Sequence, residues 1–150
     1  MPDLRGKVAL ITGSSAGIGA ATAEYFASLG CHLSLTGRNE SSLEEVKQRC
    51  MSAGLKDSQI LTTLADLNDK IQIEKLINET VKTFGKLDIL VNSAGIISTG
   101  PFLTMPIEDY DKIMNTNVRS LWIITQLCVP HLIKTKGTIV NVSSIAGPCA

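Results

Sequence analysis

A glycine-rich segment near the N-terminus carries the first residues whose types and spacing could do chemistry. It reads Thr12-Gly13-Ser14-Ser15-Ala16-Gly17-Ile18-Gly19 and stands between a short apolar run and a stretch with helical spacing. Glycines at such a turn accept positive φ and let the backbone approach a ligand with no Cβ in the way. A helix that follows would direct unpaired N–H groups and a partial positive charge at the same point. The segment is therefore predicted to bind a pyrophosphate; the alternative is a tight turn whose glycines serve packing alone.

Three more polar motifs follow along the chain. Asn92-Ser93-Ala94-Gly95 comes after an apolar run, Thr116-Asn117-Val118 lies in a long helical pattern, and Ile139-Val140-Asn141-Val142-Ser143-Ser144 ends an apolar run in two serines. Together with the glycine-rich turn, these motifs resemble the short-chain dehydrogenase/reductase family. The resemblance covers nearly the whole chain, and four motifs in order make it far more specific than any one of them.

The resemblance implies an oxidoreductase that transfers a hydride between a nicotinamide cofactor and a small alcohol or carbonyl substrate. It implies that the Ser144 hydroxyl steadies the substrate carbonyl and that the backbone of Asn117 holds a water in a proton relay. Two alternatives stay open from the residues alone. Ser144 could be a strand-end serine that caps the next turn, and Asn117 a helix-interior asparagine that bonds to backbone.

The same resemblance implies further cofactor contacts. Asn92 would tie the central strands together, while Ala94 and Gly95 would leave room for the cofactor. Asp66-Leu67 resembles the family's contact with the adenine edge, where the carboxylate accepts from the exocyclic amine. Asp66 could also be the N-cap of the helix expected to begin near residue 69, and the two roles are compatible.

The end of the second predicted strand indicates which cofactor is bound. Sites for NAD usually carry Asp or Glu there to bind the ribose 2′-hydroxyl, whereas this chain has Gly37 and then Arg38. A guanidinium can bind a 2′-phosphate through two charge-assisted hydrogen bonds, and Ser14, Ser15 and Asn39 could add neutral donors. We therefore expect NADP(H) to be favoured over NAD(H). The alternative is that Arg38 is a solvated residue that opens the next helix.

The family's Tyr-x-x-x-Lys motif, its general acid and tuning lysine, does not occur in these 150 residues. Tyr25 and Tyr110 both precede Ser144, and neither is followed by Lys four positions later. Loss of a positioned general acid costs about 10²–10⁴ in rate. We therefore expect the chain as given to bind cofactor without turnover. The favoured interpretation is the N-terminal part of a longer enzyme; the alternative is a short product that binds nucleotide, or pairs with another subunit, without catalysis.

Apolar and amphipathic segments alternate along the chain, which predicts the elements that must position these residues. Strands are expected at 7–12, 32–36, 60–65, 87–91 and 138–142, and helices at 20–29, 42–53, 69–84 and 109–132. Pro130 is expected to bend or end the last helix, which could form two pieces. This alternation predicts one α/β domain over residues 1–150, a Rossmann-type doubly wound parallel sheet that lacks the family's C-terminal strands. The fifth strand, apolar on both faces, would then be an exposed edge.

Composition excludes several classes of protein. Fourteen Lys and Arg balance fourteen Asp and Glu, which argues against nucleic-acid or anionic-membrane partners. With 44% hydrophobic and 19% charged residues, the chain is too apolar to be disordered. No signal-peptide pattern opens it, and its longest apolar stretch is too short to span a bilayer. We expect a cytoplasmic protein that forms homo-oligomers when full length.

Cysteine, histidine and aromatic residues are expected to be structural. The chain has four widely spaced cysteines, Cys31, Cys50, Cys128 and Cys149, with no C-x-x-C pair and no histidine at ligand spacing. This spacing predicts reduced, buried thiols and neither disulfides nor a metal site. Tyr110 and Trp122 are expected to be packing residues.

Overall fold

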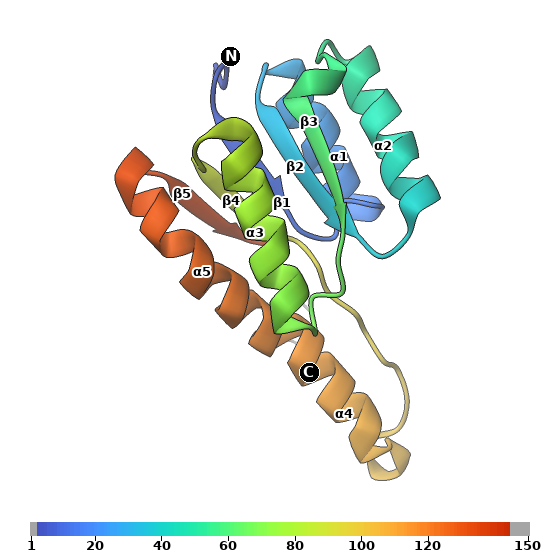
Figure 1. Ribbon diagram of the computed structural model, residues 1–150. Coiled ribbons are helices and arrows are strands. Elements are labelled where there is room, and N and C mark those ends of the chain that lie inside the picture. Colours follow the sequence, from blue (N-terminus) through green and yellow to red (C-terminus); the bar gives the residue numbers. More distant parts are fainter. Residues whose placement is uncertain (1–2, 145–150) are drawn as a thin grey trace.

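The computed structural model describes residues 3–144, in which strands and helices alternate from end to end (Figure 1). In chain order the elements are β1 (Val8–Ile11), α1 (Gly17–Ser28), β2 (His32–Gly37), α2 (Glu40–Ser52), β3 (Ile60–Leu64), α3 (Lys70–Phe84), β4 (Ile89–Asn92), α4 (Ile107–Met114), α5 (Ser120–Thr135) and β5 (Thr138–Asn141). A π-helical segment, Asn115–Arg119, joins α4 to α5. Each predicted strand and helix is present, with ends that differ by a few residues.

The five strands form one parallel sheet in the order β3-β2-β1-β4-β5. From β1 the chain first builds outward through β2 and β3, then returns to the other side of β1 for β4 and β5. The predicted doubly wound parallel sheet is therefore confirmed. The reversal of strand order beside β1 creates a crevice at the carboxyl ends of the strands, where ligands of such sheets bind.

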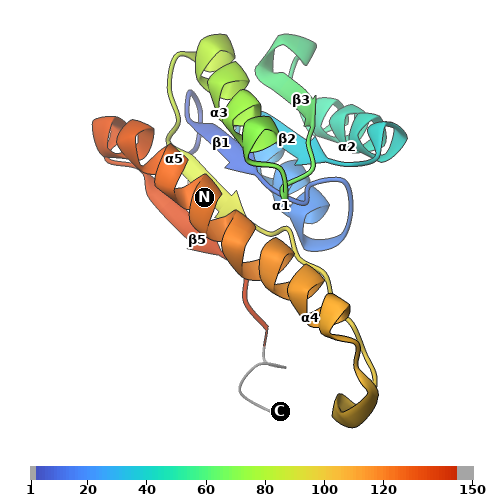
Figure 2. The same cartoon turned by 60° about the horizontal axis from the view of Figure 1, so that its bottom comes forward.

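Two apolar cores lie on opposite faces of the sheet, because helices cover both (Figures 1 and 2). Successive residues of β1 alternate between them. Ala9 and Ile11 pack in the core beneath α1 and α2, and Val8 and Leu10 in the core beneath α3 and α5. A strand buried on both faces needs apolar residues at every position, which explains its continuous apolar run.

Short polar residues and glycine set the ends of α3. The Asp69 side chain accepts from the backbone N–H of Ile71 at 2.9 Å and caps the start of the helix. Gly85 ends it in the left-handed conformation at φ 76°, which a residue with a Cβ adopts at a cost. The N-cap of α3 is therefore Asp69, and the expectation that Asp66 could be this cap is wrong.

The long helical stretch after β4 differs from its prediction. Pro130 does not end α5, which continues to Thr135. Tyr110 and Trp122 do not pack in a core, since they are 51% and 71% exposed. Figure 2 shows α4 extending beyond the sheet.

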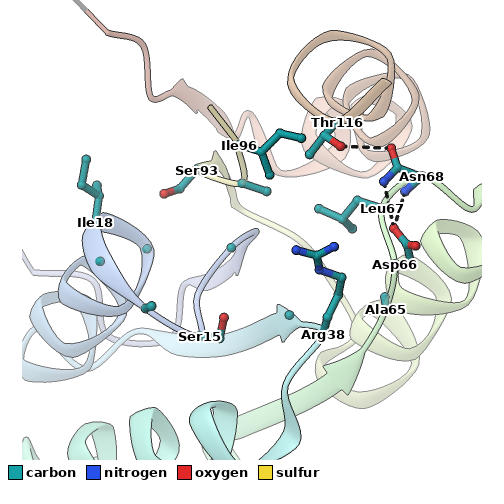
Figure 3. A pocket seen from close by; sticks show the side chains of 17 residues that line it. Ser15, Ile18, Arg38, Ala65, Asp66, Leu67, Asn68, Ser93, Ile96 and Thr116 are labelled. Carbon is teal, nitrogen blue, oxygen red and sulfur yellow. Dashed lines mark hydrogen bonds between the residues drawn. The ribbon is translucent and has the colours of Figure 1, made fainter. Parts of the chain in front are cut away.

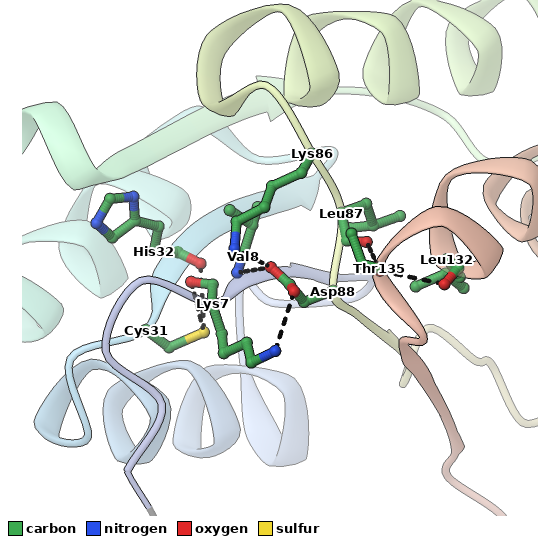
Figure 4. Close-up of polar contacts among 9 residues, drawn as sticks. All are labelled: Lys7, Val8, Cys31, His32, Lys86, Leu87, Asp88, Leu132 and Thr135. Carbon is green, nitrogen blue, oxygen red and sulfur yellow. Dashed lines mark hydrogen bonds and ion pairs between the residues drawn. The ribbon is translucent and has the colours of Figure 1, made fainter.

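A buried carboxylate joins β1 and β4 at their amino ends, opposite the crevice (Figure 4). Asp88 accepts from the backbone N–H of Val8 at 2.9 Å and pairs with the Nζ atoms of Lys7 and Lys86 at 3.3 and 3.0 Å. Burial alone would raise the pKa of this carboxyl, but hydrogen bonds from Lys86, Val8 and Lys7 hold the pKa below its usual value. Asp88 is thus ionised and stabilises the fold near neutral pH.

Three cysteines are buried free thiols, as predicted. Burial raises the pKa of Cys31 and Cys128 to about 12 and that of Cys50 to about 11, so these thiols stay protonated and inert. The prediction for Cys149 lies outside the described residues. Within residues 3–144, no helix is both long enough and apolar enough to cross a membrane.

Candidate functional site

A cleft of about 380 Å³ lies at the carboxyl ends of four strands. Its lining comes from the segments that follow β1, β2, β3 and β4, together with one residue of the π-helical segment. The lining comprises residues 13, 15–19, 37–38, 65–68, 93–96 and 116. The cleft therefore occupies the crevice that the reversal of strand order creates, and its size suits a small-molecule ligand.

The glycine-rich turn forms one wall of the cleft. Gly13 has φ 63°, and a Cβ there would lie 2.8 Å from the Ala94 Cα atom. Gly17 has φ 55°, and a Cβ there would enter open space beside the cleft. Helix α1 begins at this point without a side-chain cap, so its first N–H groups remain available. The turn therefore presents bare backbone and helix-end donors, the surroundings that suit a pyrophosphate.

Ser14 does not line the cleft, contrary to the expectation that it donates to a phosphate. Its side chain is buried; Oγ donates to the Thr36 carbonyl at 3.2 Å and accepts from the Thr36 N–H at 2.8 Å. Because the hydroxyl proton already has a backbone acceptor, Ser14 fastens the turn to β2.

Arg38 and Ser15 do meet at the cleft. Figure 3 shows the Arg38 side chain extending from the end of β2 into the cavity, with Ser15 on the adjoining wall. Gly37 lies against Ser15, because a Cβ on this glycine would be 3.0 Å from the serine Oγ atom. Within residues 3–144 the exposed guanidinium of Arg38 makes no hydrogen bond or ion pair, so it is available to a ligand.

Asn39 lies outside the cleft lining, which corrects its expected role. Its Oδ1 atom accepts from the Ser42 backbone N–H at 3.0 Å and from Ser41 Oγ at 2.8 Å. These bonds make Asn39 the N-cap of α2. A side chain that caps its own helix is turned toward that helix instead of the cavity.

Asp66 and Leu67 form the wall that follows β3. The Asp66 Oδ1 atom accepts from the backbone N–H of Asn68 at 2.9 Å and from its Nδ2 atom at 3.1 Å. The Asp66 N–H donates to Gln72 Oε1 at 2.8 Å. These bonds fix the loop, and Leu67 is buried beside it. Both residues line the cleft.

The motif after β4 supplies the opposite wall through Ala94 and Gly95. Asn92 is buried behind this wall; its Nδ2 atom donates to Asn141 Oδ1 at 2.9 Å and to Thr125 Oγ1 at 3.2 Å. It ties β4 to β5 and α5 and does not line the cleft.

Asn117 and Ser144 do not line the cleft. The Asn117 side chain bonds twice to the backbone of Ile96, where Oδ1 accepts from N–H and Nδ2 donates to the carbonyl, both at 2.8 Å. It thereby holds the loop after β4. Ser144 follows β5 at the carboxyl ends of the strands, which is the end of the sheet where the cleft lies, and it is exposed.

Some residues important to the cleft were not among the predicted site residues. Thr12 Oγ1 accepts from the N–H groups of Ser93 and Ala94, each at 3.0 Å, which joins the turn after β1 to the turn after β4. Asn68 and Thr116 line the cleft and bond to each other at 3.2 Å. No sequence signal pairs two residues 48 positions apart. Within residues 3–144, no group of three His, Cys, Asp or Glu side chains could hold a metal ion.

Strand order, glycine-rich turn and cleft together define a Rossmann-type dinucleotide-binding protein. The family pattern described as short chain dehydrogenase matches residues 7–150, and the chain belongs to the short-chain dehydrogenase/reductase family. Proteins of this family are oxidoreductases that bind NAD(P).

Individual relatives span the same region. The chain is 37% identical over 146 residues to a 3-oxoacyl-[acyl-carrier-protein] reductase of Thermotoga maritima, covering 96% of this chain and 58% of that protein. A glucose dehydrogenase of Caenorhabditis elegans, solved in the apo form, is 43% identical with a TM-score of 0.89, covering 97% of this chain and 57% of that one. A family member of unknown function from the same organism, solved with cofactor, is 40% identical with a TM-score of 0.93, covering 99% and 57%. This chain thus spans less than two thirds of each.

Proposed function

We propose that this chain binds NADP(H), in preference to NAD(H), in the cleft at the carboxyl ends of β1–β4. It would form the cofactor-binding part of an oxidoreductase that acts on an alcohol or carbonyl substrate. One observation carries the proposal, which is that the bare glycine-rich backbone and Arg38 border the same cavity. When bound, the nicotinamide supplies or accepts a hydride.

Each wall of the cleft would hold a different part of the cofactor. The backbone between Gly13 and Gly19, including that of Ile18, would hold the pyrophosphate beside the start of α1. Arg38 and Ser15 would hold the 2′-phosphate, because a planar guanidinium can donate two parallel hydrogen bonds to it. Asp66 and Leu67 would meet the adenine edge and face. Ala94 and Gly95, with a small side chain or none, would admit the remainder of the dinucleotide.

The catalytic assignments concern two residues near the carboxyl ends of β4 and β5. We assign the Ser144 hydroxyl to steady a substrate carbonyl and the backbone of Asn117 to hold a water. The side-chain bonds of Asn117 to Ile96 fix that backbone in place. Since no Tyr-x-x-x-Lys follows Ser144 in these 150 residues, the chain alone should not oxidise NADPH with simple ketones or 3-oxoacyl thioesters.

A titration of NADPH and NADH against the wild type and Arg38→Gln tests the proposal. The wild type should bind NADPH, and Arg38→Gln should weaken NADPH about tenfold while leaving NADH unchanged, because only NADPH carries the 2′-phosphate. Arg49→Gln is the matched control, since Arg49 pairs with Glu24 away from the cleft. An equal loss for both cofactors would refute the assignment of Arg38.

A non-catalytic protein that binds nucleotide or pairs with another subunit is the second candidate. Exposed apolar side chains along α4, the π-helical segment and α5 favour it, among them Tyr110, Val118 and Trp122. The same side chains would support a homo-oligomer of a full-length enzyme. The molecular mass in solution distinguishes a monomer from a homo-oligomer and from a complex with another subunit. The three buried thiols fit the cytoplasmic location that we propose.

A further inference from the structure

A series of hydrogen-bonded side chains along one side of the cleft joins the π-helical segment to the loop after β3 (Figure 3). Thr116 Oγ1 donates to Asn68 Oδ1 at 3.2 Å, and Asn68 Nδ2 donates to Asp66 Oδ1 at 3.1 Å. The orientation of the Asn68 amide follows from chemistry, because an ionised carboxylate can only accept. Its NH₂ group therefore faces Asp66, and its oxygen is left for the threonine hydroxyl.

Thr116, which lies at the helix end of this hydrogen-bonded series, is itself fixed in place. The Oγ atom of Ser120, the first residue of α5, donates to the carbonyl of Thr116 in the π-helical segment at 2.5 Å. The next residue, Asn117, bonds twice to the backbone of Ile96. Successive helical residues point in different directions, so Thr116 and Asn117 reach two different loops from one turn.

The loop after β3 and the loop after β4 are thereby connected through one rigid turn of helix. The first loop carries Asp66 and the second carries Ile96, and both residues line the cleft. Thr116 and Asn68 thus add a side-chain hydrogen bond between two walls that also meet in the apolar core, where Leu67 and Ala94 pack. A ligand that contacts both walls at once depends on their spacing, whereas a ligand that contacts one wall does not.

We propose that Asn68 and Thr116 are positioning residues that hold the two walls at the separation one dinucleotide requires. This inference rests on the proposed function, with the adenosine portion at the Asp66 wall and the nicotinamide portion at the Ile96 wall. The pair raises affinity for the whole dinucleotide without contributing to affinity for its adenosine half.

The test compares NADPH with adenosine 2′,5′-bisphosphate, which contains the adenine and the 2′-phosphate but lacks the nicotinamide half. Calorimetric titration of Thr116→Val should show three- to tenfold weaker binding of NADPH and less than a twofold change for the bisphosphate. Thr116→Ser keeps the hydroxyl and should restore NADPH binding. Thr83→Val, on the exposed face of α3, is the matched control and should change neither ligand.

The same substitution made in an Asn68→Ala variant separates a positioning role from a general structural effect. Thr116→Val should weaken NADPH binding no further once Asn68→Ala has removed the other half of the pair. Unchanged NADPH binding by Thr116→Val, or equal weakening of both ligands, would overturn the positioning role while leaving the cofactor site intact. Failure of the wild type to bind either ligand would instead refute the proposed function, and this inference with it.

Discussion

Thr12 shows how a residue can shape the cleft without facing it. Its side chain is buried, and its hydroxyl oxygen accepts from Ser93 and Ala94 while donating to the Val91 carbonyl at 3.4 Å. Three backbone groups of the β4 segment are therefore satisfied by one side chain at the end of β1. The close approach of Gly13 to Ala94 depends on this connection.

Replacement of Thr12 by valine should destabilise the chain. The isosteric change leaves two backbone N–H groups without their acceptor, which costs about 2 kcal/mol of unfolding free energy. Thr12→Ser keeps the hydroxyl and should retain most of the stability. Urea unfolding followed by circular dichroism measures both variants, and an unchanged stability of Thr12→Val would show that the hydroxyl does not matter.

Asp88 should make stability depend on pH. Because its folded-state pKa lies below its usual value, its stabilisation is present above the unfolded pKa of about 3.9 and is lost as pH falls through the folded pKa. Asp88→Asn keeps an acceptor for Val8 but removes both ion pairs, which should cost about 1–2 kcal/mol at pH 7.

The difference between wild type and Asp88→Asn should therefore shrink from pH 7 to pH 3. Urea unfolding at both values measures it. The exposed Asp111→Asn serves as the control and should track the wild type throughout. A difference that stays constant with pH would contradict the ionised state assigned to Asp88.

At the scale of elements, periodicity and end signals predicted the sheet and its helices well. Asp69 and Gly85 mark the ends of α3 because a side-chain N-cap and a left-handed glycine suit helix ends independently of tertiary contacts. The π-helical segment could not be predicted, since its side chains bond to loops that are distant in sequence. Continuation of α5 past Pro130 has the same origin, because packing of Ile124, Cys128 and Leu132 in the core outweighs one missing hydrogen bond.

Pro130→Ala should stabilise the chain. The proline is exposed within a helix that runs five residues further, and alanine restores the missing N–H donor, so unfolding free energy should rise by about 1 kcal/mol or more. Pro106→Ala is the control, because φ at Pro106 is −62° and suits proline; it should not stabilise. Thermal unfolding measures both, and a lower melting temperature for Pro130→Ala would contradict the account.

The site was predictable where its residues sit at strand ends, and less so where side chains bond locally. Ser15, Arg38, Asp66 and Gly95, which were predicted to bind cofactor, line the cleft. Ser14 and Asn39 do not, because short polar side chains beside a turn bond first to nearby backbone. Sequence spacing places a residue at the carboxyl edge, but it does not determine the direction of its side chain.

At the scale of the whole molecule, β3 and β5 are the two edge strands of the sheet within residues 3–144. β5 pairs with β4, and within residues 3–144 no strand pairs with its other edge. Ile139 and Val140 on this strand are exposed, as the sequence predicted. The cleft lies between the segments that follow β1–β4, all of which are described, so binding can be measured on this chain.

We propose above that the cleft binds NADP(H) more tightly than NAD(H). Isothermal titration calorimetry of the wild-type chain with NADPH and with NADH, in the same buffer, measures this preference. We expect saturable one-to-one binding of NADPH that is about tenfold tighter than that of NADH, from the charge-assisted bonds of Arg38 to the 2′-phosphate. Tighter binding of NADH, or binding of neither cofactor, would contradict it.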